Sequence, residues 1–341
     1  MSQVPSVKPV RLAFVSTAHI HAKHFIEWTA AATDGRCVQA VWDDLPERGR
    51  RHAALAGARF EPDLAALVRD PAVDGFVICA ENTRHLPLLR RVLTAGKPVL
   101  CEKPLVTTGA EAREVAALLR SNPAKLFCGY FLPFSAELGA VGAMLANDGF
   151  GRITRIRIRN SHGGAYARLF DAPDLRWFTE PALSGGGAFM DVGAHAVHLA
   201  RTLFGPVTEV WAEIGNHTGI YPACDDYGIA HLRFASGVLG TIEAAWTQTG
   251  AENGLEIIGA EKLLWQVGRD YVTGRHGQGE PQPLVPGKSR PAQIDRLVAA
   301  IRGELTPAEL QSDLTACLDS VAIMEACYVS AKSGRWTRIS S

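Results

Sequence analysis

The chain has 341 residues, which is long enough for two domains of average size. Hydrophobic residues make up 47% and charged residues 21%, as is ordinary for a soluble globular protein. Lys plus Arg equals Asp plus Glu at 35 each, so no net charge attracts the chain to nucleic acid or to an anionic membrane. We therefore expect neither as a partner.

The cysteines and the N-terminal residues bear on the cellular compartment. No two of the seven cysteines form a C-x-x-C pair, and most stand in apolar runs such as Phe76–Cys79. This usage is typical of small buried side chains in a reducing compartment. Met1–Pro9 lacks a charged segment followed by an apolar one, and no apolar stretch approaches the ~18 residues needed to span a bilayer. We expect a cytoplasmic protein.

The first third of the chain alternates between short apolar runs and helical patterns. The apolar runs predict strands at residues 11–15, 37–42, 74–80, 99–101 and 125–128. Strands separated by helices indicate βαβ units and a parallel sheet with helices on both faces. Residues 1–128 are thus predicted to form a doubly wound α/β domain with its ligand at the carboxyl ends of the strands. A domain of this kind that binds no dinucleotide is the alternative.

Residues 129–341 have a different character. Residues 152–160 alternate strictly between polar and apolar side chains, as in a strand with one face on a core. Further strands are predicted at residues 208–213, 229–234, 239–244 and 255–258, with Ser236–Gly237 as a hairpin turn. We expect a largely antiparallel sheet, then a loop over residues 274–291 and closing helices at 292–301 and 310–332.

The turn after the first predicted strand is where a dinucleotide-binding fold usually carries G-x-G-x-x-G. Those glycines let the pyrophosphate approach the helix N-terminus. The three positions here hold Ser16, Ala18 and His21, of which only the first two are small. His19 and His21 form an H-x-H pair, but no second ligand cluster follows at a useful spacing. We predict no metal and interpret both histidines as loop or cofactor-lining residues.

An acidic pair, Asp43 and Asp44, ends the second predicted strand. An acid at this place in a dinucleotide-binding fold holds the ribose hydroxyls and would repel a 2′-phosphate, which favours NAD over NADP. Arg48 and Arg50 nearby keep NADP as an alternative. A solvated turn or a helix cap is the other interpretation of the pair.

Two further motifs carry side chains suited to hydride transfer. Lys103 directly precedes a proline, which holds it extended, and a lysine at a strand end can orient a hydroxyl or polarise a carbonyl. Asp191 and His195 follow three glycines and are four residues apart, hence neighbours on one helix face. An Asp beside a His raises its basicity. A surface lysine, a structural His–Asp pair and a metal site that includes His198 are the alternatives.

The combination of these motifs resembles a known family. E-K-P at Glu102–Pro104, followed by G-G-G-x-x-x-D-x-G-x-H at Gly185–His195, is similar to the Gfo/Idh/MocA family, named for glucose–fructose oxidoreductase, inositol dehydrogenase and a rhizopine-catabolism protein. The similarity covers nearly the whole chain and is most specific over residues 95–105. It implies that Lys103 is the catalytic lysine, often followed by a cis bond, that Asp191 orients the substrate, and that His195 is the acid/base.

The resemblance also implies an architecture and a set of cofactor contacts. A Rossmann domain would be followed by a substrate-binding α+β domain on a large open, mostly antiparallel sheet, through which the family forms homodimers or homotetramers. The family often has Thr-Pro at Ala80–Glu81 and an aspartate at His198, so both are departures. The expected cofactor contacts are Ser16, Ala18, His19, His21, Asp43, Ala80, Asn82, His85, Glu102 and Lys103.

Together with these residues, the resemblance implies an NAD(P)-dependent oxidoreductase that acts on a secondary alcohol or ketone of a sugar, a polyol or a related small molecule. The cofactor would supply the redox chemistry, and Lys103 would stabilise charge that develops on the substrate oxygen. A non-catalytic nucleotide-binding sensor and an NAD-dependent glycosidase remain as alternatives. Four residues before the triple glycine are candidates for a substrate-lining loop, with a surface loop as the alternative: His162, Arg168, Arg176 and Trp177.

Overall fold

The computed structural model describes residues 9–122, 124–268, 270–275 and 277–339. Residues 1–8, in which the sequence predicts no targeting segment, lie outside the described residues. The chain divides into two compact units, and each is formed by several separate segments. The first contains Met1–Val106, Ala110–Gly129 and Pro291–Thr315. The second contains Thr107–Gly109, Tyr130–Arg290 and Ala316–Ser341.

The first unit is built on a six-stranded sheet in the order β3-β2-β1-β4-β5-β6, in which every neighbouring pair is parallel. The order reverses beside β1, which confirms the predicted doubly wound architecture and marks the edge where such folds bind ligands. The strands are β1 (Val10–Thr17), β2 (Arg36–Trp42), β3 (Arg59–Phe60), β4 (Gly75–Cys79), β5 (Val99–Cys101) and β6 (Leu126–Cys128).

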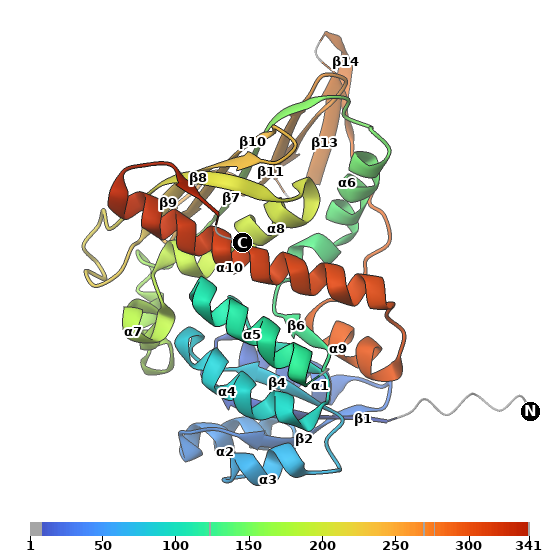
Figure 1. The fold of residues 1–341 in the computed structure, drawn as a ribbon, viewed down its shortest axis with the longest axis vertical. Coiled ribbons are helices and arrows are strands. Elements are labelled where there is room, and N and C mark those ends of the chain that lie inside the picture. Colours follow the sequence, from blue (N-terminus) through green and yellow to red (C-terminus); the bar gives the residue numbers. More distant parts are fainter. Residues whose placement is uncertain (1–8, 123, 269, 276, 340–341) are drawn as a thin grey trace, which may run out of the picture. The chain divides into compact units, whose positions relative to one another are not determined.

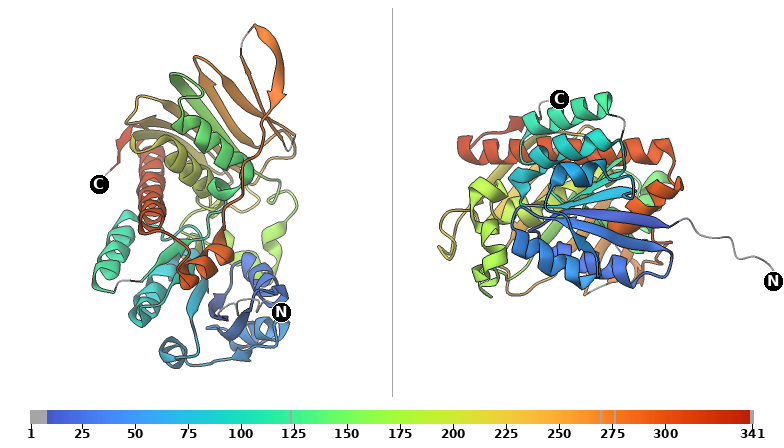
Figure 2. Two further views of the ribbon diagram at one scale, coloured as in Figure 1. Left: turned by 90° about the vertical axis from the view of Figure 1, so that its right-hand side faces the viewer. Right: turned by 90° about the horizontal axis from the view of Figure 1, so that it is seen from below.

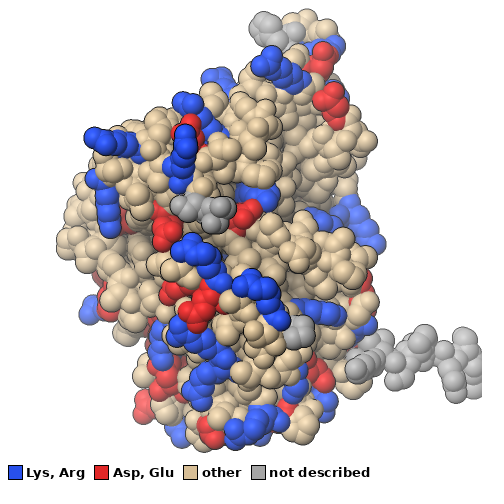
Figure 3. Space-filling model, in the orientation of Figure 1, with Lys and Arg blue, Asp and Glu red and all other residues tan. Residues whose placement is uncertain are grey.

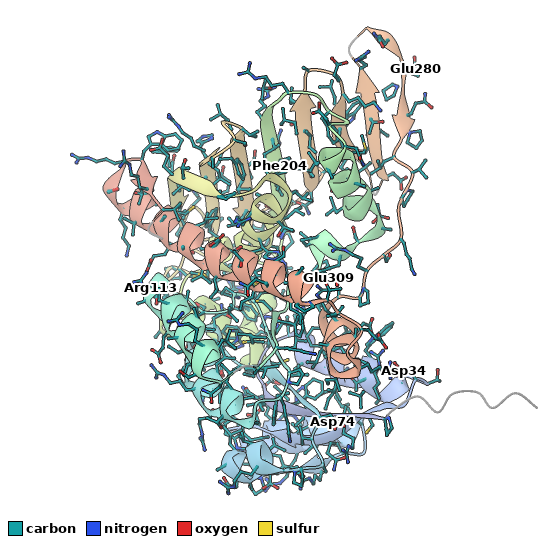
Figure 4. All side chains as sticks on the ribbon, turned by 45° about the vertical axis from the view of Figure 1, so that its right-hand side comes forward. Asp34, Asp74, Arg113, Phe204, Glu280 and Glu309 are labelled. Atoms are coloured by element: carbon teal, nitrogen blue, oxygen red, sulfur yellow. The ribbon has the colours of Figure 1, made fainter. Side chains whose placement is uncertain are left out.

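Helices pack on this sheet and complete its core. They are α1 (His21–Ala31), α2 (Pro46–Leu55), α3 (Leu64–Arg69), α4 (His85–Val92), α5 (Gly109–Ser121) and α9 (Gln293–Arg302), with the 3-10 turns η1 (Asn82–Arg84) and η2 (Leu93–Ala95). Apolar side chains of α9 share one buried cluster with β1, β2, β4 and α1. Arg302 of α9 also binds Asp34, which Figure 4 labels in the turn before β2. A helix from late in the sequence is therefore part of the core of the first unit.

The second unit is built on a nine-stranded sheet in the order β14-β13-β12-β11-β7-β10-β9-β8-β15 (Figure 1). All its neighbouring pairs are antiparallel except β7 with β10, as a mostly antiparallel sheet requires. The strands are β7 (Ile153–Ser161), β8 (Val207–Gly215), β9 (Tyr227–Phe234), β10 (Leu239–Ala245), β11 (Gly254–Gly259), β12 (Leu263–Val267), β13 (Asp270–Arg275), β14 (Gln278–Pro283) and β15 (Thr337–Arg338).

One strand lies where the sequence predicts only a loop. β14 falls inside residues 274–291, although Pro281 and Pro283 cannot donate a backbone hydrogen bond. The strand pairs with β13 alone and forms an edge of the sheet, where prolines are tolerated because the outer side needs no donor. The expectation of a loop throughout this segment is therefore wrong, while the Ser236–Gly237 turn between β9 and β10 is confirmed, with Gly237 at a φ of 88°.

The helices of the second unit include α8 (Ala194–Phe204), which follows the triple-glycine motif and contains His195. They are α6 (Ala136–Ala146), α7 (Pro181–Ser184), α8 and most of α10 (Pro307–Ser333), with the 3-10 turns η3 (Leu132–Phe134), η4 (Leu169–Asp171) and η5 (Pro173–Thr179) and the π turn η6 (Phe189–Gly193). α8 packs against β7 and β10, on one face of the sheet (Figure 2). Buried residues of β10 largely alternate with less buried ones. One face of the sheet is thus covered by α8.

Three properties of the whole chain bear on its surroundings. In the part of the chain that the structure describes, α10 alone is long and apolar enough to cross a membrane by length and composition, which the sequence analysis did not anticipate. Half of the qualifying window is buried within the protein, as is typical of a core helix. The seven cysteines are free thiols, and all except Cys37 are buried. Figure 3 shows basic and acidic side chains interspersed on the face it presents.

Candidate cofactor and active site

β1 ends in the turn that replaces the glycine fingerprint. Ser16 has a φ of 64°, in the left-handed region that favours glycine, and the pairing of β1 with β4 is irregular at this residue. Ser16, Ala18 and His19 are buried, and His21 begins α1. The chain thus makes the turn without its first glycine, at a strain of ~1–2 kcal/mol. Ser16, Thr17 and Ala18 are small, but His19 and Ile20 directly precede the helix N-terminus where a pyrophosphate would approach.

Asp43 follows β2 and is held by the protein's own donors. It is 2% exposed and accepts hydrogen bonds from the N–H and O–H of Thr17 at 2.8 and 2.7 Å and from the Leu45 N–H at 2.8 Å. Arg48 Nη2 donates to Oδ1 at 2.8 Å. Burial raises the pKa of Asp43, but the hydrogen bonds and charge of Arg48 and the Thr17 hydroxyl outweigh it and lower the pKa below its usual value. Asp43 is therefore ionised and fixed in place.

Asp44 presents the more accessible carboxylate of the acidic pair. Its side chain is 26% exposed and pairs with Arg48 at 3.1 Å and with Arg84. Glu81 also faces both guanidinium groups, at 3.6 and 3.5 Å. Arg48 is thus surrounded by three carboxylates, so it does not present an unpaired charge to a 2′-phosphate. Arg50, the other basic residue considered for NADP, stacks its guanidinium over Phe60 at 4.9 Å.

A buried carboxylate and two imidazoles meet at the edge formed by the ends of β1 and β5. Oε1 of Glu102 lies 3.1 Å from Nδ1 of His21 and 4.0 Å from Nδ1 of His19, and Oε2 accepts the Lys103 N–H at 2.9 Å. Burial opposes ionisation of Glu102, but the neighbouring histidines outweigh it and hold its pKa well below the usual range. A Cβ at Gly129 would stand 2.5 Å from Oε2, so this glycine makes room for the carboxylate.

Lys103 is 4% exposed, and its bond to Pro104 is cis, as the resemblance implies. His85, at the start of α4, is fully buried, with Nδ1 2.8 Å from the Pro104 carbonyl oxygen and Nε2 3.2 Å from that of Ala80. Burial lowers the pKa of His85 despite these two carbonyl groups. Its ring therefore links the end of β4 to the loop that carries Lys103. Asn82, also buried, begins η1 beside it.

All the residues predicted to contact the cofactor therefore lie in the first unit, at the end of β1 or in the segments that follow β1, β2, β4 and β5. Because these strands are parallel, the segments meet at the carboxyl edge of one sheet. Small side chains at the β1 turn and the partly exposed carboxylate of Asp44 suit a dinucleotide with a free ribose hydroxyl. Lys103 belongs to this unit, whereas Asp191 and His195 belong to the second.

In the second unit, close packing requires the glycines before α8. A Cβ at Gly187 would stand 2.0 Å from the Asp225 carbonyl oxygen, and Gly185 has a φ of 77° beside Thr107. The Asp225 carboxylate accepts the N–H groups of Gly187 and Phe189 at 2.8 and 2.7 Å. Burial raises the pKa of Asp225. This carboxylate fixes the entry to the segment that contains Asp191.

Asp191 lies in the π turn η6, not in the regular helix that the sequence predicts. Trp246, which follows β10 and is fully buried, donates its indole N–H to Asp191 Oδ2 at 2.9 Å. Asn160 donates to the Val192 carbonyl at 2.8 Å. π turns are frequent at functional sites. Sequence reasoning missed Trp246, although a tryptophan directly after a buried strand signals an indole N–H that needs a buried acceptor.

His195 and His198 of α8 have different surroundings. The His195 ring is 6% exposed and contacts the edges of Tyr130 and Phe131 at 5.6 and 5.3 Å. The His198 ring stacks on Tyr130 at 3.9 Å, and its Nε2 lies 3.8 Å from Cys317 Sγ. Within the described residues, the one His, Cys, Asp or Glu group close enough to hold a metal is His19, His21 and Glu102. The alternative metal site at α8 is therefore not formed.

The four candidate substrate residues lie in the long connection after β7. Nδ1 of His162 accepts the Gly164 N–H at 2.9 Å. Arg168 has a φ of 55°, binds Asp171 at 2.9 Å and lies over the Tyr221 ring at 5.5 Å. Arg176 is exposed in η5, whereas Trp177 is 6% exposed and stacks on Phe178 at 3.9 Å. These residues therefore have different neighbours.

Comparisons with known proteins match both parts of the chain. Residues 10–130 match the model described as "Oxidoreductase family, NAD-binding Rossmann fold", and residues 139–264 match the GFO/IDH/MocA C-terminal domain. The 1,5-anhydro-D-fructose reductase of Ensifer adhaerens is 28% identical, over 86% of this chain and 88% of the relative. Inositol 2-dehydrogenase 2 of Paenarthrobacter aurescens is 26% identical, over 97% and 99%.

Solved structures agree with these matches in fold. GenD2 from gentamicin A biosynthesis, in complex with NAD, has a TM-score of 0.79 and 25% identity, covering 98% of each chain. Levoglucosan dehydrogenase in complex with NADH has a TM-score of 0.81 and 18% identity, covering 98% of this chain and all of the other. The WlbA dehydrogenase of Bordetella pertussis, with NADH and UDP-GlcNAcA, has a TM-score of 0.80 and 23% identity, covering 98% of each.

Proposed function

The chain belongs to the GFO/IDH/MocA family of oxidoreductases and has that family's NAD-binding Rossmann domain, and from this premise we propose that it transfers a hydride between NAD and a secondary alcohol or ketone of a sugar, a polyol or a related compound. The substrate class is supported by relatives named for such compounds, among them an anhydrofructose reductase and an inositol dehydrogenase. The observation that carries the proposal is the presence of Lys103, Asp191 and His195 together in one chain of this family.

The proposed catalytic residues divide the proton chemistry between them. In the oxidation direction His195 accepts the proton of the substrate hydroxyl. Lys103 donates a hydrogen bond to the same oxygen and stabilises the negative charge that develops on it. Asp191, held by the Trp246 indole, orients the hydroxyl. NAD, held at the carboxyl edge of the first sheet, would supply the hydride acceptor, and oxidation of a secondary alcohol would yield a ketone.

We propose NAD as the preferred cofactor because carboxylates dominate the segment after β2. Asp44 is the group suited to the ribose hydroxyls, since Asp43 is occupied by Thr17, Leu45 and Arg48. A 2′-phosphate would meet Asp44 and Glu81 beside guanidinium groups that they already neutralise. Titration calorimetry with NAD and NADP measures this preference directly.

The remaining proposals concern assembly and location. We propose that residues 1–128 serve the cofactor and residues 129–341 the substrate, and that the sheet of the second unit forms a homodimer or homotetramer. Its strands carry charged pairs such as Arg157 and Arg159 with Glu243. Light scattering on the purified protein measures its mass. We also propose a cytoplasmic location, in keeping with seven free thiols.

A dehydrogenase screen with site variants tests the function. Purified protein is assayed with NAD against a panel of polyols, aldoses and anhydro sugars by absorbance at the NADH band. For a substrate that reacts, Lys103→Ala and His195→Ala should each lose at least ~10²-fold in turnover and keep NAD binding. Exposed Lys262→Ala and His24→Ala are the matched controls and should keep full turnover. NAD binding without any turnover across the panel, in either direction, contradicts the proposal and favours a sensor.

A further inference from the structure

His19, His21 and Glu102, which are also expected to contact the cofactor, form a cluster of possible metal ligands. One ring nitrogen from each histidine and one carboxylate oxygen lie within 4.8 Å of one another. The histidines stand where β1 passes into α1, and the carboxylate follows β5. All three belong to the first unit, and their placement does not depend on the second. The sequence analysis predicted no metal because Glu102, the third group, is far from the H-x-H pair in the chain.

The distances are close to those of a metal site. A tetrahedral Zn²⁺ ion with bonds of about 2.0–2.2 Å to nitrogen and oxygen separates its ligand atoms by roughly 3.3 Å. The observed separation of His21 Nδ1 from Glu102 Oε1 is 3.1 Å, and that of His19 Nδ1 from the same oxygen is 4.0 Å. Nδ1 of His19 would have to approach Glu102 Oε1 by less than an ångström.

The hydrogen bonds around the cluster prepare its groups as ligands. His21 N–H donates to Nδ1 of His19 at 3.3 Å, so this nitrogen is unprotonated, and a metal ion would take its lone pair in place of that hydrogen bond. The Lys103 N–H fixes the carboxylate through Oε2, which leaves Oε1 facing both imidazoles. Outer-shell bonds of this kind orient metal ligands. If Glu102 served only to accept a hydrogen bond from His21, the imidazole of His19 would not be needed beside them.

Burial favours a cation here. Glu102 is fully buried, His19 is 2% exposed, and the His21 side chain is 35% exposed, which leaves a route from solvent. An anionic carboxylate removed from water is stabilised by a positive charge at contact distance. Two imidazole nitrogens and one carboxylate oxygen are the donors that Zn²⁺ and its neighbours in the first transition row accept.

We propose that His19, His21 and Glu102 bind one divalent transition-metal ion of the Zn²⁺ class at the cofactor-binding edge of the first unit. Three protein ligands leave at least one position for water or another exogenous ligand, as in open metal sites. The site shares residues with the expected cofactor contacts, but binding of the ion does not rest on the proposed hydride transfer.

Titration calorimetry with Zn²⁺ on tag-free, chelator-treated protein tests the proposal. We expect one ion per chain, with binding weakened more than ~100-fold in Glu102→Gln and in His19→Asn, beyond the ~10–100-fold that the loss of an outer-shell partner costs. His24→Asn is the matched control, because His24 lies on α1 with His21 but outside the cluster. This variant should bind Zn²⁺ like the parent. Anomalous scattering at the zinc edge should place the ion between the three side chains.

Two outcomes overturn the proposal. One is the lack of stoichiometric Zn²⁺ binding by folded parent protein, and the other is binding that survives both Glu102→Gln and His21→Asn. Because Glu102 is buried, circular dichroism checks that its variant folds, and His21→Asn, at a partly exposed position, is the milder substitution. The titration needs neither NAD nor substrate, so an active dehydrogenase that ignores zinc overturns this inference alone.

Discussion

Ser16 stands in a backbone conformation that glycine adopts without strain. Its φ is 64°, and its buried Oγ has no hydrogen-bond partner among the residues that the structure describes. The β1 turn therefore has the backbone conformation expected of a glycine at this position, but with steric strain and an unsatisfied hydroxyl. This residue is a direct test of how far the altered loop departs from its usual form.

Ser16→Gly should stabilise the protein by up to ~1 kcal/mol, since removal of Cβ and the hydroxyl outweighs the extra freedom of the unfolded chain. Urea denaturation of the cofactor-free protein measures the change. Ser236→Gly is the control, because Ser236 lies in an exposed turn without positive φ, and it should be neutral or slightly destabilising. An unfolding midpoint for Ser16→Gly at or below that of the parent would show that the turn is not strained.

The Asp43–Arg48 pair predicts how stability depends on pH. The folded pKa of Asp43 lies below its ordinary value of about 3.9 because Arg48 and Thr17 outweigh its burial. A carboxyl with a lowered pKa contributes stability above the unfolded value, and the contribution is lost as pH falls through that value towards the folded one. The fold should therefore weaken on acidification below about pH 4.

Arg48→Met leaves the buried Asp43 carboxylate without its cation. We expect the unfolding free energy at pH 7 to fall by ~3–5 kcal/mol and the loss on acidification to become shallower. Urea denaturation at a series of pH values measures both. Arg90→Met breaks the exposed pair with Glu114 and should unfold like the parent. A variant with the pH dependence of the parent would mean that Asp43 is not the group responsible.

Trp246 predicts a positioning effect. Trp246→Phe keeps most of the buried ring but removes the indole donor to Asp191. If Asp191 orients the substrate, kcat/KM should fall ~10–100-fold, the value of a hydrogen bond to a charged group, with the Kd for NAD unchanged. Trp211→Phe, on β8 and stacked on His231, is the control. Equal kcat/KM for the parent and Trp246→Phe would remove Trp246 from the site.

At the scale of elements, the segment before α8 needs glycine because it packs closely against Asp225, a contact that the sequence alone does not reveal. Gly187→Ala should destabilise the protein by ~3 kcal/mol, because the new Cβ would stand 2.0 Å from the backbone of Asp225. Thermal unfolding measures this, with Gly250→Ala as the control, since a Cβ there meets nothing within 4 Å. Two variants of equal stability would mean that the turn relaxes freely.

The sequence predicted most elements because their apolar spacing is regular. β1, β2 and β4 appear as apolar runs, and β9 and β10 as alternating strands around Ser236–Gly237. Five strands were missed: β3, β12, β13, β14 and β15. β3 and β15 have two residues each and show no period, and prolines hide the edge strand β14. The π turn at Asp191 also leaves no mark on hydrophobic spacing. At the candidate site the residue types were evident, but the Trp246–Asp191 bond and the grouping of Glu102 with His19 and His21 depend on contacts between distant segments.

At the scale of the whole molecule, the first unit is incomplete without α9. Ile294, Leu297 and Val298 are buried in its core cluster. Each such side chain contributes about 1.5–3 kcal/mol, and together they match much of the ~5–15 kcal/mol that stabilises a typical domain. The compact unit is therefore not the first 129 residues alone.

A fragment of residues 1–129 should not unfold cooperatively, whereas the same fragment joined by a flexible linker to residues 291–315 should. Circular dichroism during urea titration distinguishes the two, and the linked fragment serves as the control for solubility. A sharp transition in the fragment of residues 1–129 alone would show that α9 is dispensable.

Because α9 is late in the sequence, the first unit can complete its core only late in translation. A ribosome delivers the strands of the first unit early, but Pro291–Thr315 emerges only after the whole of Tyr130–Arg290. Until then the apolar surface that α9 covers has no native partner, and such surfaces on nascent chains favour aggregation. The nucleotide-binding sheet is thus translated first but completed late, so chaperones that bind nascent chains should hold this protein through most of its synthesis.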